Sequence, residues 1–156
     1  MTLFAQLAAL LAIVSTGIVY GTDAFSALVL RSAVARVDDN TLTATMGNVH
    51  RFADRRMPAP GILGIIAAAA ASVLAAVAGR SAGSATAGAA FLLLVAWVLL
   101  YLRISAPINR RLTAAAEAHE TPANARTLQG DWNRIIVPRA VLQGLAVLAL
   151  GVSLIT

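Results

Sequence analysis

Two side chains capable of acid–base chemistry stand four residues apart, His50 and Asp54. Residues at this spacing share one face of an α-helix, so the carboxylate is placed to orient the imidazole ring and raise its basicity. A histidine in that arrangement is a candidate general base if a pocket shields it from bulk water. The alternative is a surface histidine on a solvated, Arg-rich helix face, and the sequence leaves both interpretations open.

Asp23 is the second candidate because it stands inside an apolar run. If that helix ends at Leu30, the carboxylate lies about 10 Å inside the membrane-spanning segment, at 1.5 Å of rise per residue. An unpaired carboxylate there costs on the order of 3 kcal/mol. Arg139 stands at a similar depth in the last apolar segment, so we predict that the two side chains pair directly or through water. Whether the pair only joins two helices or also takes part in function stays open.

Further polar and aromatic side chains recur at helical spacing around these two. One stripe belongs to the first apolar segment and another to the last, with residues separated by three or four positions so that each stripe shares a helix face. The first stripe is Thr16, Tyr20, Asp23 and Ala27, and the second is Gln129, Trp132, Ile136, Arg139 and Gln143. We expect both stripes to face the protein interior, where Tyr20, Asp23, Trp132 and Gln143 would contact a ligand.

The sequence restricts other chemistry. The chain has no Cys, which excludes a disulfide framework, thiolate ligands and a thiol nucleophile. Glu117 and His119 are two residues apart and so lack the Glu-x-x-His spacing of di-iron helix bundles. A metal site that His50, Asp54, His119 and Glu120 share is conceivable, but no metal ligand is assigned and no cofactor is firmly implied. His119 itself has the surroundings of an ordinary helix-surface residue.

The elements that must position these residues are four apolar segments, at about 3–30, 61–79, 87–105 and 135–155. Each is close to the roughly 20 apolar residues that cross a bilayer as a helix. The Gly- and Ser-rich gap at 80–86 is typical of a tight turn between antiparallel helices. The sequence therefore predicts an all-α fold, a bundle of four transmembrane helices that forms a single domain over residues 1–156.

The charge distribution predicts the orientation. All twelve basic residues are Arg, and all but Arg80 fall in the stretches 31–59 and 103–139. Because Arg-rich connections face the cytoplasm, both stretches are expected there, with both termini outside the cell membrane. This topology and the attraction of anionic lipids account for the net charge of +5 better than nucleic-acid binding does. The first segment lacks the positive start of a secretory signal and is expected to be retained.

Both connections carry helix signals. In the first, Asp38 to Asn40 offer N-caps, and Leu42, Met46, Val49 and Ala53 follow at helical spacing before Met57 and Pro58. In the second, a helix from Pro107 to about Glu120 is broken at Thr121 and Pro122, and another helix leads into the last span. We expect amphipathic helices at the membrane interface in both, in a plan consistent with a two-helix repeat.

Several of these motifs together resemble a known family. Pro107-Ile108-Asn109-Arg110-Arg111-Leu112, Trp132-Asn133-Arg134 and Arg139, with Gly17 and Gly21 in the first span, are similar to the anthrone oxygenase-like family of small four-helix membrane proteins. The segment from Gly47 to Pro58 has no role that this resemblance supplies. Family members oxidise anthrones to anthraquinones, without a tightly bound organic cofactor, so the resemblance implies oxidation of a small apolar aromatic substrate by dioxygen.

Residue chemistry then suggests roles within that reaction. His50 would remove a proton from an activated methylene, with Asp54 orienting its ring, while Arg139 and Asn109 stabilise the enolate oxygen. Trp132 would stack on the aromatic substrate. These assignments come from the chemistry of the side chains, because the family supplies no agreed catalytic set.

Two other functions stay open. A non-catalytic bundle would bind a lipid, a quinone-like molecule or a partner membrane protein, with Asp23 and Arg139 purely structural. A proton or ion transporter would use Asp23, but the other spans hold few ionisable groups to continue a path. Gly17 and Gly21 form a GxxxG pattern that favours close helix packing, either inside the monomer or in a homo-oligomer.

Overall fold

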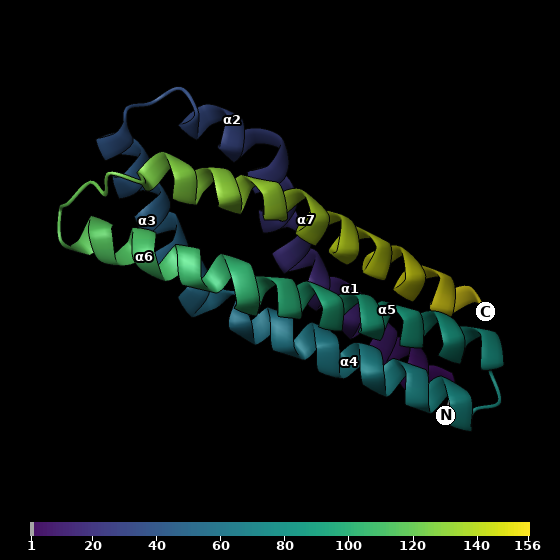
Figure 1. Ribbon diagram of the computed structural model, residues 1–156. Helices are drawn as coiled ribbons and strands as arrows, with labels where there is room; N and C mark the ends of the chain where they lie inside the picture. Colours follow the sequence, from purple (N-terminus) through teal and green to yellow (C-terminus); the bar gives the residue numbers. More distant parts are fainter. Residues whose placement is uncertain (1) are drawn as a thin grey trace. The chain divides into compact units, whose positions relative to one another are not determined.

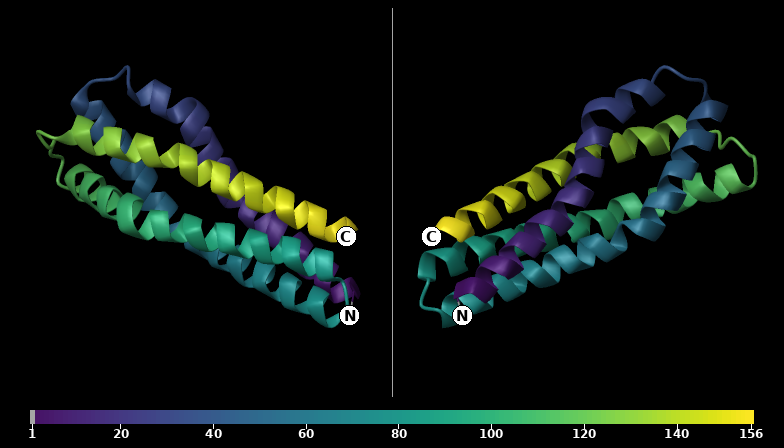
Figure 2. Two further views of the ribbon diagram at one scale, coloured as in Figure 1. Left: turned by 45° about the vertical axis from the view of Figure 1, so that its right-hand side comes forward. Right: turned by 180° about the vertical axis from the view of Figure 1, so that it is seen from behind.

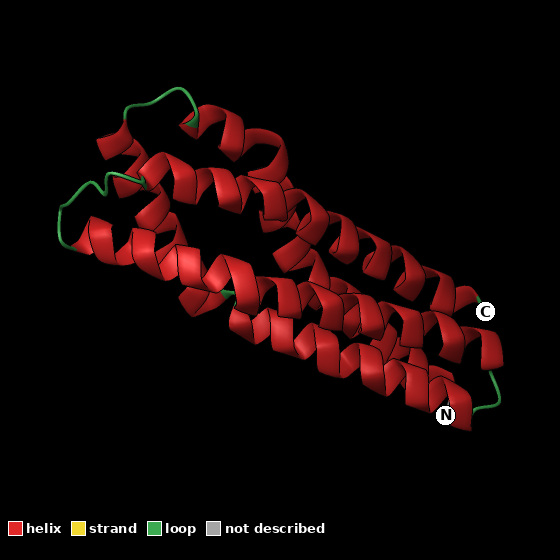
Figure 3. Cartoon of the chain, viewed as in Figure 1, coloured by secondary structure: helices red, strands yellow, loops and turns green. Residues whose placement is uncertain are grey.

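The computed structural model describes residues 2–156, and those residues form helices joined by short loops (Figures 1 and 3). The first two apolar segments and the connection between them give α1 (Thr2–Phe25), the π-helical turn η1 (Ser26–Leu30), α2 (Arg31–Val34), α3 (Asp39–Arg56) and α4 (Pro58–Val77). The rest of the chain gives α5 (Ser81–Leu100), the π-helical turn η2 (Tyr101–Ser105), α6 (Ala106–Glu117) and α7 (Ala125–Ile155). The all-α prediction is confirmed.

Four helical stretches are long and apolar enough to cross a membrane, which agrees with the number of predicted spans. They cover Thr2–Val34, Pro58–Val77, Ser81–Glu117 and Ala125–Ile155. The first, third and fourth extend well beyond the predicted spans, because these helices continue into the charged connections. A helix of 37 residues rises about 55 Å, well beyond the roughly 30 Å of a hydrocarbon core.

Contacts between residues divide the chain into two compact units. Unit 1 comprises 1–21, 58–98 and 141–156, and unit 2 comprises 22–57 and 99–140. Charge follows this division, since unit 2 holds eleven of the twelve Arg residues and all seven acidic residues. The prediction of a single domain stays a prediction.

Unit 1 has a core of small side chains. Its buried clusters consist of Ala residues together with Leu94 and Leu150. Large apolar side chains point outward instead, including Leu7, Ile66 and Leu148, each about half exposed or more. Small residues inside let helices approach closely, and a surface of Leu, Val and Ile suits lipid better than water. The packing of unit 1 thus agrees with the membrane-spanning character of its helices.

The turn between α4 and α5 explains how unit 1 reverses direction. Gly79 has a φ of 74°, and the amides of Gly79 and Arg80 bond back to the carbonyls of Ala76 and Ala75. This is the Schellman arrangement, in which glycine occupies the left-handed position at little cost. The Arg80 guanidinium then donates to the Ser153 carbonyl at 2.9 Å and so satisfies the end of α7.

Unit 2 is built around α3 and α6, which lie side by side (Figure 2). α3 begins and ends as predicted, with the Asp38 side chain accepting from the Thr41 amide at 2.9 Å and Met57 as the C-cap. Gly47 marks the closest approach to α6: a Cβ there would lie 2.5 Å from the Leu112 carbonyl oxygen and would also meet the Ala116 side chain. Only glycine allows this crossing.

The second connection agrees with the predicted order of helix, break and helix, although α6 ends at Glu117 rather than at about Glu120. α6 begins at Ala106 directly after η2, so no loop separates it from the preceding span. Beyond the break after Glu117, the helix predicted to lead into the last span is the first part of α7 itself. Arg126 near the start of α7 holds the first connection in place: it pairs with Asp39 at 2.6 Å and donates to the carbonyls of Val34 and Val37.

The GxxxG pattern of α1 makes no close contact among residues 2–156. A Cβ added at Gly17 or Gly21 would have no heavy atom within 4 Å among the described residues. These glycines therefore do not mediate a tight helix crossing within residues 2–156. The predicted alternative in which this face packs inside the monomer is wrong. Packing of the same face in a homo-oligomer stays a prediction.

Candidate functional site

The predicted site residues fall into two groups. Asp23, His50, Asp54, Asn109, Trp132 and Arg139 belong to unit 2, whereas Tyr20 and Gln143 belong to unit 1. In unit 1 the Tyr20 ring packs on Gly144, where a Cβ would lie 3.3 Å from it, and Gln143 is fully buried. The predicted stripe of α7 is confirmed as an interior face, since all five of its residues are buried.

Asp23 and Arg139 form the predicted ion pair. Arg139 Nη2 lies 2.9 Å from Asp23 Oδ2, and both side chains are 7% exposed. Arg139 Nη1 also donates to the Ser105 hydroxyl at 2.9 Å, and its guanidinium carbon stands 5.3 Å from the centre of the Tyr101 ring. A buried pair with these additional contacts is satisfied in the way that burial of charge requires.

Asp54 has partners other than the one we expected. Its Oδ1 accepts hydrogen bonds from the Tyr101 hydroxyl and the Asn109 side-chain amide, both at 2.9 Å. Asp54 therefore does not orient the His50 ring by a hydrogen bond. His50 and Asp54 do share a face of α3, but donors from two other elements, η2 and α6, bond to the carboxylate. The spacing of residues within one helix cannot reveal donors that come from other helices.

His50 is 2% exposed, and its ring packs against Trp132 with the centroids 5.2 Å apart. Its Nε2 is buried and has no hydrogen-bond partner among residues 2–156. Burial, and secondarily the positive charge of Arg139, lowers the pKa of His50 to about 3. The imidazole is therefore neutral near pH 7, buried, and has a nitrogen available to a ligand.

Apart from the Nε atoms of the ion-paired Arg51 and Arg139, three more buried polar atoms of unit 2 have no hydrogen-bond partner within the described residues. They are Asn109 Oδ1, Gln129 Oε1 and Trp132 Nε1. Chemistry decides which end of the Asn109 side chain is left without a partner. The amide nitrogen must face the Asp54 carboxylate, because a carboxylate only accepts hydrogen bonds, so the oxygen points the other way. Buried polar groups are nearly always satisfied, so each such group needs an explanation, such as water or a ligand. Together they supply one donor, two acceptors and the neutral imidazole.

Sequence reasoning missed Tyr101 and Ser105 as members of this network. Both lie in η2, where a π-helical turn shifts which side chains share a face. One available signal was Tyr101 at the end of an otherwise apolar run, since a Tyr there carries a hydroxyl that needs a partner when buried. The α-helical periodicity used for prediction does not report a π-helical turn.

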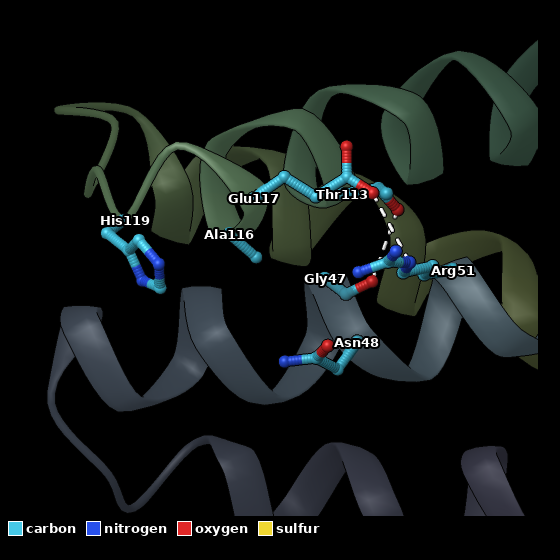
Figure 4. Close-up of a pocket in the computed structure, with 7 residues that line it drawn as sticks. All are labelled: Gly47, Asn48, Arg51, Thr113, Ala116, Glu117 and His119. Carbon is cyan, nitrogen blue, oxygen red and sulfur yellow. Dashed lines mark hydrogen bonds and ion pairs between the residues drawn. The ribbon is translucent and has the colours of Figure 1, made fainter.

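His119 lies at a different site from His50. A cavity of about 230 Å³ lies between α3 and α6, and its seven lining residues include Asn48, Arg51, Glu117 and His119 but not His50 (Figure 4). No cluster of three or more His, Asp or Glu side chains suited to a metal exists within residues 2–156. The shared site of His50, Asp54, His119 and Glu120 is therefore not formed.

No family model, no curated protein and no solved structure matches the chain. The geometry of unit 2 is therefore the basis for assigning a function.

Proposed function

We propose that this protein is a multi-pass membrane protein that binds a small, flat, apolar molecule with polar oxygens, such as a quinone or an aromatic hydroxyketone. The ligand would bind at the buried side chains His50, Asn109, Gln129 and Trp132 of unit 2. The four apolar helical stretches and the outward-facing large apolar side chains of unit 1 support the membrane location. In this proposal α3 and α6 are interfacial helices of cytoplasmic connections in a four-helix bundle, and both termini lie outside.

The observation that carries the proposal is the set of partnerless buried atoms at His50, Asn109, Gln129 and Trp132. Leaving one such group unsatisfied costs about 1–3 kcal/mol, so a bound molecule that satisfies several gains that free energy. The Trp132 indole donates to a carbonyl oxygen, and a neutral imidazole nitrogen or an amide oxygen accepts from a hydroxyl. A ligand with both groups on an apolar frame matches this set, and it partitions readily into lipid.

A second candidate function is oxidation of such a molecule, which the resemblance to anthrone oxygenases implies. It is favoured by the neutral His50 near the charge of Arg139. The base would take one proton from the activated methylene, and dioxygen would add to the carbanion to give a hydroperoxide. Loss of water from the hydroperoxide then leaves a ketone. Overall, one dioxygen converts the CH₂ group to C=O and one water is released. We place binding first, because a general base works best with a pKa near the ambient pH and burial lowers that of His50 to about 3.

Binding can be tested with the two tryptophans of the chain, Trp97 and Trp132. Protein in lipid nanodiscs is titrated with a dihydroxyanthraquinone while indole fluorescence is followed. We expect saturable quenching in the wild type and in the matched control Trp97→Phe, where Trp132 is the remaining reporter. Quenching in Trp132→Phe should weaken or vanish. Equal quenching in both variants would indicate partitioning of the dye into lipid and would end the proposal.

Oxidation is measured separately, as dioxygen consumption with a dihydroxyanthrone. We expect one dioxygen consumed per anthrone, faster than in protein-free nanodiscs, with the acceleration lost in His50→Gln. If His50→Gln keeps the full acceleration, His50 is not the base, while the binding proposal still stands on the fluorescence result. If the wild type consumes dioxygen no faster than protein-free nanodiscs, oxidation is not its function and the binding proposal remains.

A further inference from the structure

The cavity between α3 and α6 is not lined by His50, and it has a polar lining of its own. Arg51 from α3 and His119 from the end of α6 lie toward opposite ends of the group of lining residues, with Gly47 and Ala116 between them (Figure 4). The cavity has room for a group the size of a phosphate, at about 230 Å³. Its lining comes from the middle of α3 and from the last part of α6 and the residues that follow it.

Arg51 has capacity to bind an anion there. Its Nε lies 3.3 Å from Glu117 Oε1, but this nitrogen makes no aligned hydrogen bond. Within residues 2–156 the ion pair with Glu117 is the only polar contact of the Arg51 head group, since no hydrogen bond from the guanidinium is found. The two terminal nitrogens therefore keep their donors, and a planar guanidinium fork fits phosphate oxygens in bidentate fashion.

The backbone conformation of His119 also marks this cavity as a site. Its φ is 55°, and the amides of His119 and Glu120 bond to the carbonyls of Ala116 and Ala115. The end of α4 uses the same hydrogen bonds with Gly79 in the left-handed position, as helix ends commonly do. A histidine in that position is strained, and strained residues concentrate at functional sites. The strained turn places the imidazole on the cavity wall.

We propose that this cavity binds a phosphate group through the Arg51 guanidinium and the His119 imidazole. The side chain of Asn48 lines the same cavity: its amide nitrogen donates one hydrogen to the Ala44 carbonyl at 2.8 Å and keeps a second for a ligand. The phosphate comes either from a phospholipid head group or from a free phosphate, and both carry the same oxygens. A cytoplasmic connection at the membrane surface is where head groups of anionic lipids gather. This site is independent of the ligand proposed for His50, which does not line it.

The test uses the full chain and two probes. Detergent-purified protein is titrated with inorganic phosphate by calorimetry, and the same protein is mixed with phosphatidylcholine vesicles with and without phosphatidic acid. Binding of inorganic phosphate alone identifies a free phosphate as the ligand, and binding only to vesicles that contain phosphatidic acid identifies the lipid. If neither probe binds, the proposal is overturned.

Matched variants locate the binding. Arg51→Gln should weaken binding about tenfold, as expected from the loss of a charge-assisted bidentate contact. The control Arg55→Gln removes the same charge one helical turn away on α3, outside the lining of the cavity, and should bind as the wild type does. His119→Gly relieves the strained turn, so the protein should fold at least as well while binding phosphate less tightly. An equal loss in Arg51→Gln and Arg55→Gln would show a diffuse basic surface and would refute the site.

Discussion

Arg139 and Asp23 form a buried ion pair between residues 116 positions apart in the chain, with the guanidinium Nη2 2.9–3.0 Å from both carboxylate oxygens. Removing one partner leaves the other charge buried. We expect Asp23→Ala to lower the free energy of unfolding by about 3–5 kcal/mol, whereas the double variant Asp23→Ala with Arg139→Leu should recover part of that loss. Unfolding in detergent micelles by a denaturing surfactant, followed by circular dichroism, measures both. An additive double variant would show that the two side chains do not interact energetically.

The pKa of His50 gives a pH dependence whose sign is defined. Burial lowers this pKa from 6.5 to about 3 in the folded protein, so the unfolded chain binds a proton between these values and the folded protein does not. Stability from this group is complete above pH 6.5 and falls by up to about 1.4 kcal/mol per pH unit as the pH decreases toward 3. The carboxylates titrate in part of the same window, so the comparison is with His50→Gln. We expect the wild type to lose more stability than this variant between pH 6.5 and 4. Parallel curves would contradict a neutral, buried His50.

Gly47 should not tolerate a side chain, because a Cβ would lie 2.5 Å from the Leu112 carbonyl oxygen. Backbone cannot move aside as a flexible side chain does, so Gly47→Ala should destabilise the protein by about 1–3 kcal/mol through overpacking. Gly130→Ala is the matched control: that glycine lies inside α7, and nothing stands within 4 Å of a Cβ there. It should be neutral or stabilising by up to about 1 kcal/mol, since Ala favours helix. Thermal unfolding of the pair in micelles tests the difference in sign.

The Tyr101 hydroxyl should contribute measurably to stability through its 2.9 Å hydrogen bond to Asp54. Tyr101→Phe removes a donor to a carboxylate and should cost about 1–3 kcal/mol. The chain has one other tyrosine, Tyr20, whose ring packs on Gly144, and Tyr20→Phe serves as the control. We expect a much smaller loss for Tyr20→Phe in the same micelle unfolding measurement. A Tyr101→Phe variant as stable as Tyr20→Phe would mean that the bond to Asp54 adds no net stability.

The predicted orientation can be tested because the chain has no native Cys. Ala123→Cys lies in the exposed loop between α6 and α7, and Ser81→Cys lies at the exposed first residue of α5. With Arg-rich connections inside, a membrane-impermeant maleimide should label Ser81→Cys in intact cells and Ala123→Cys only after permeabilisation. The unmodified protein gives the background. The reverse labelling pattern would show that the Arg-rich connections face the outside, which is the opposite of the predicted topology.

Much of the architecture was predictable from the chain. Four apolar runs, separated by Arg-rich stretches, predict four long apolar helices, because helix length and side-chain transfer free energy are local properties. The sequence limited the start of α3 to the N-cap candidates Asp38 to Asn40, of which the structure uses Asp38, and it placed the end at the Met57-Pro58 break. The pairing of Asp23 with Arg139 was also predictable, since a deeply placed charge requires a partner and the chain offers few.

The tertiary structure decided what the polar residues do with one another. It assigned Asp54 to Tyr101 and Asn109 rather than to His50, and it left the His50 Nε2 and the Trp132 indole nitrogen buried without a partner. It also placed His119 and Arg51 on the wall of one cavity, toward its opposite ends. Periodicity shows which face of a helix a residue occupies, but hydrogen bonds depend on which other helix meets that face and at what height. The crossing at Gly47 and the π-helical turn at Tyr101 set those positions for α3, η2 and α6.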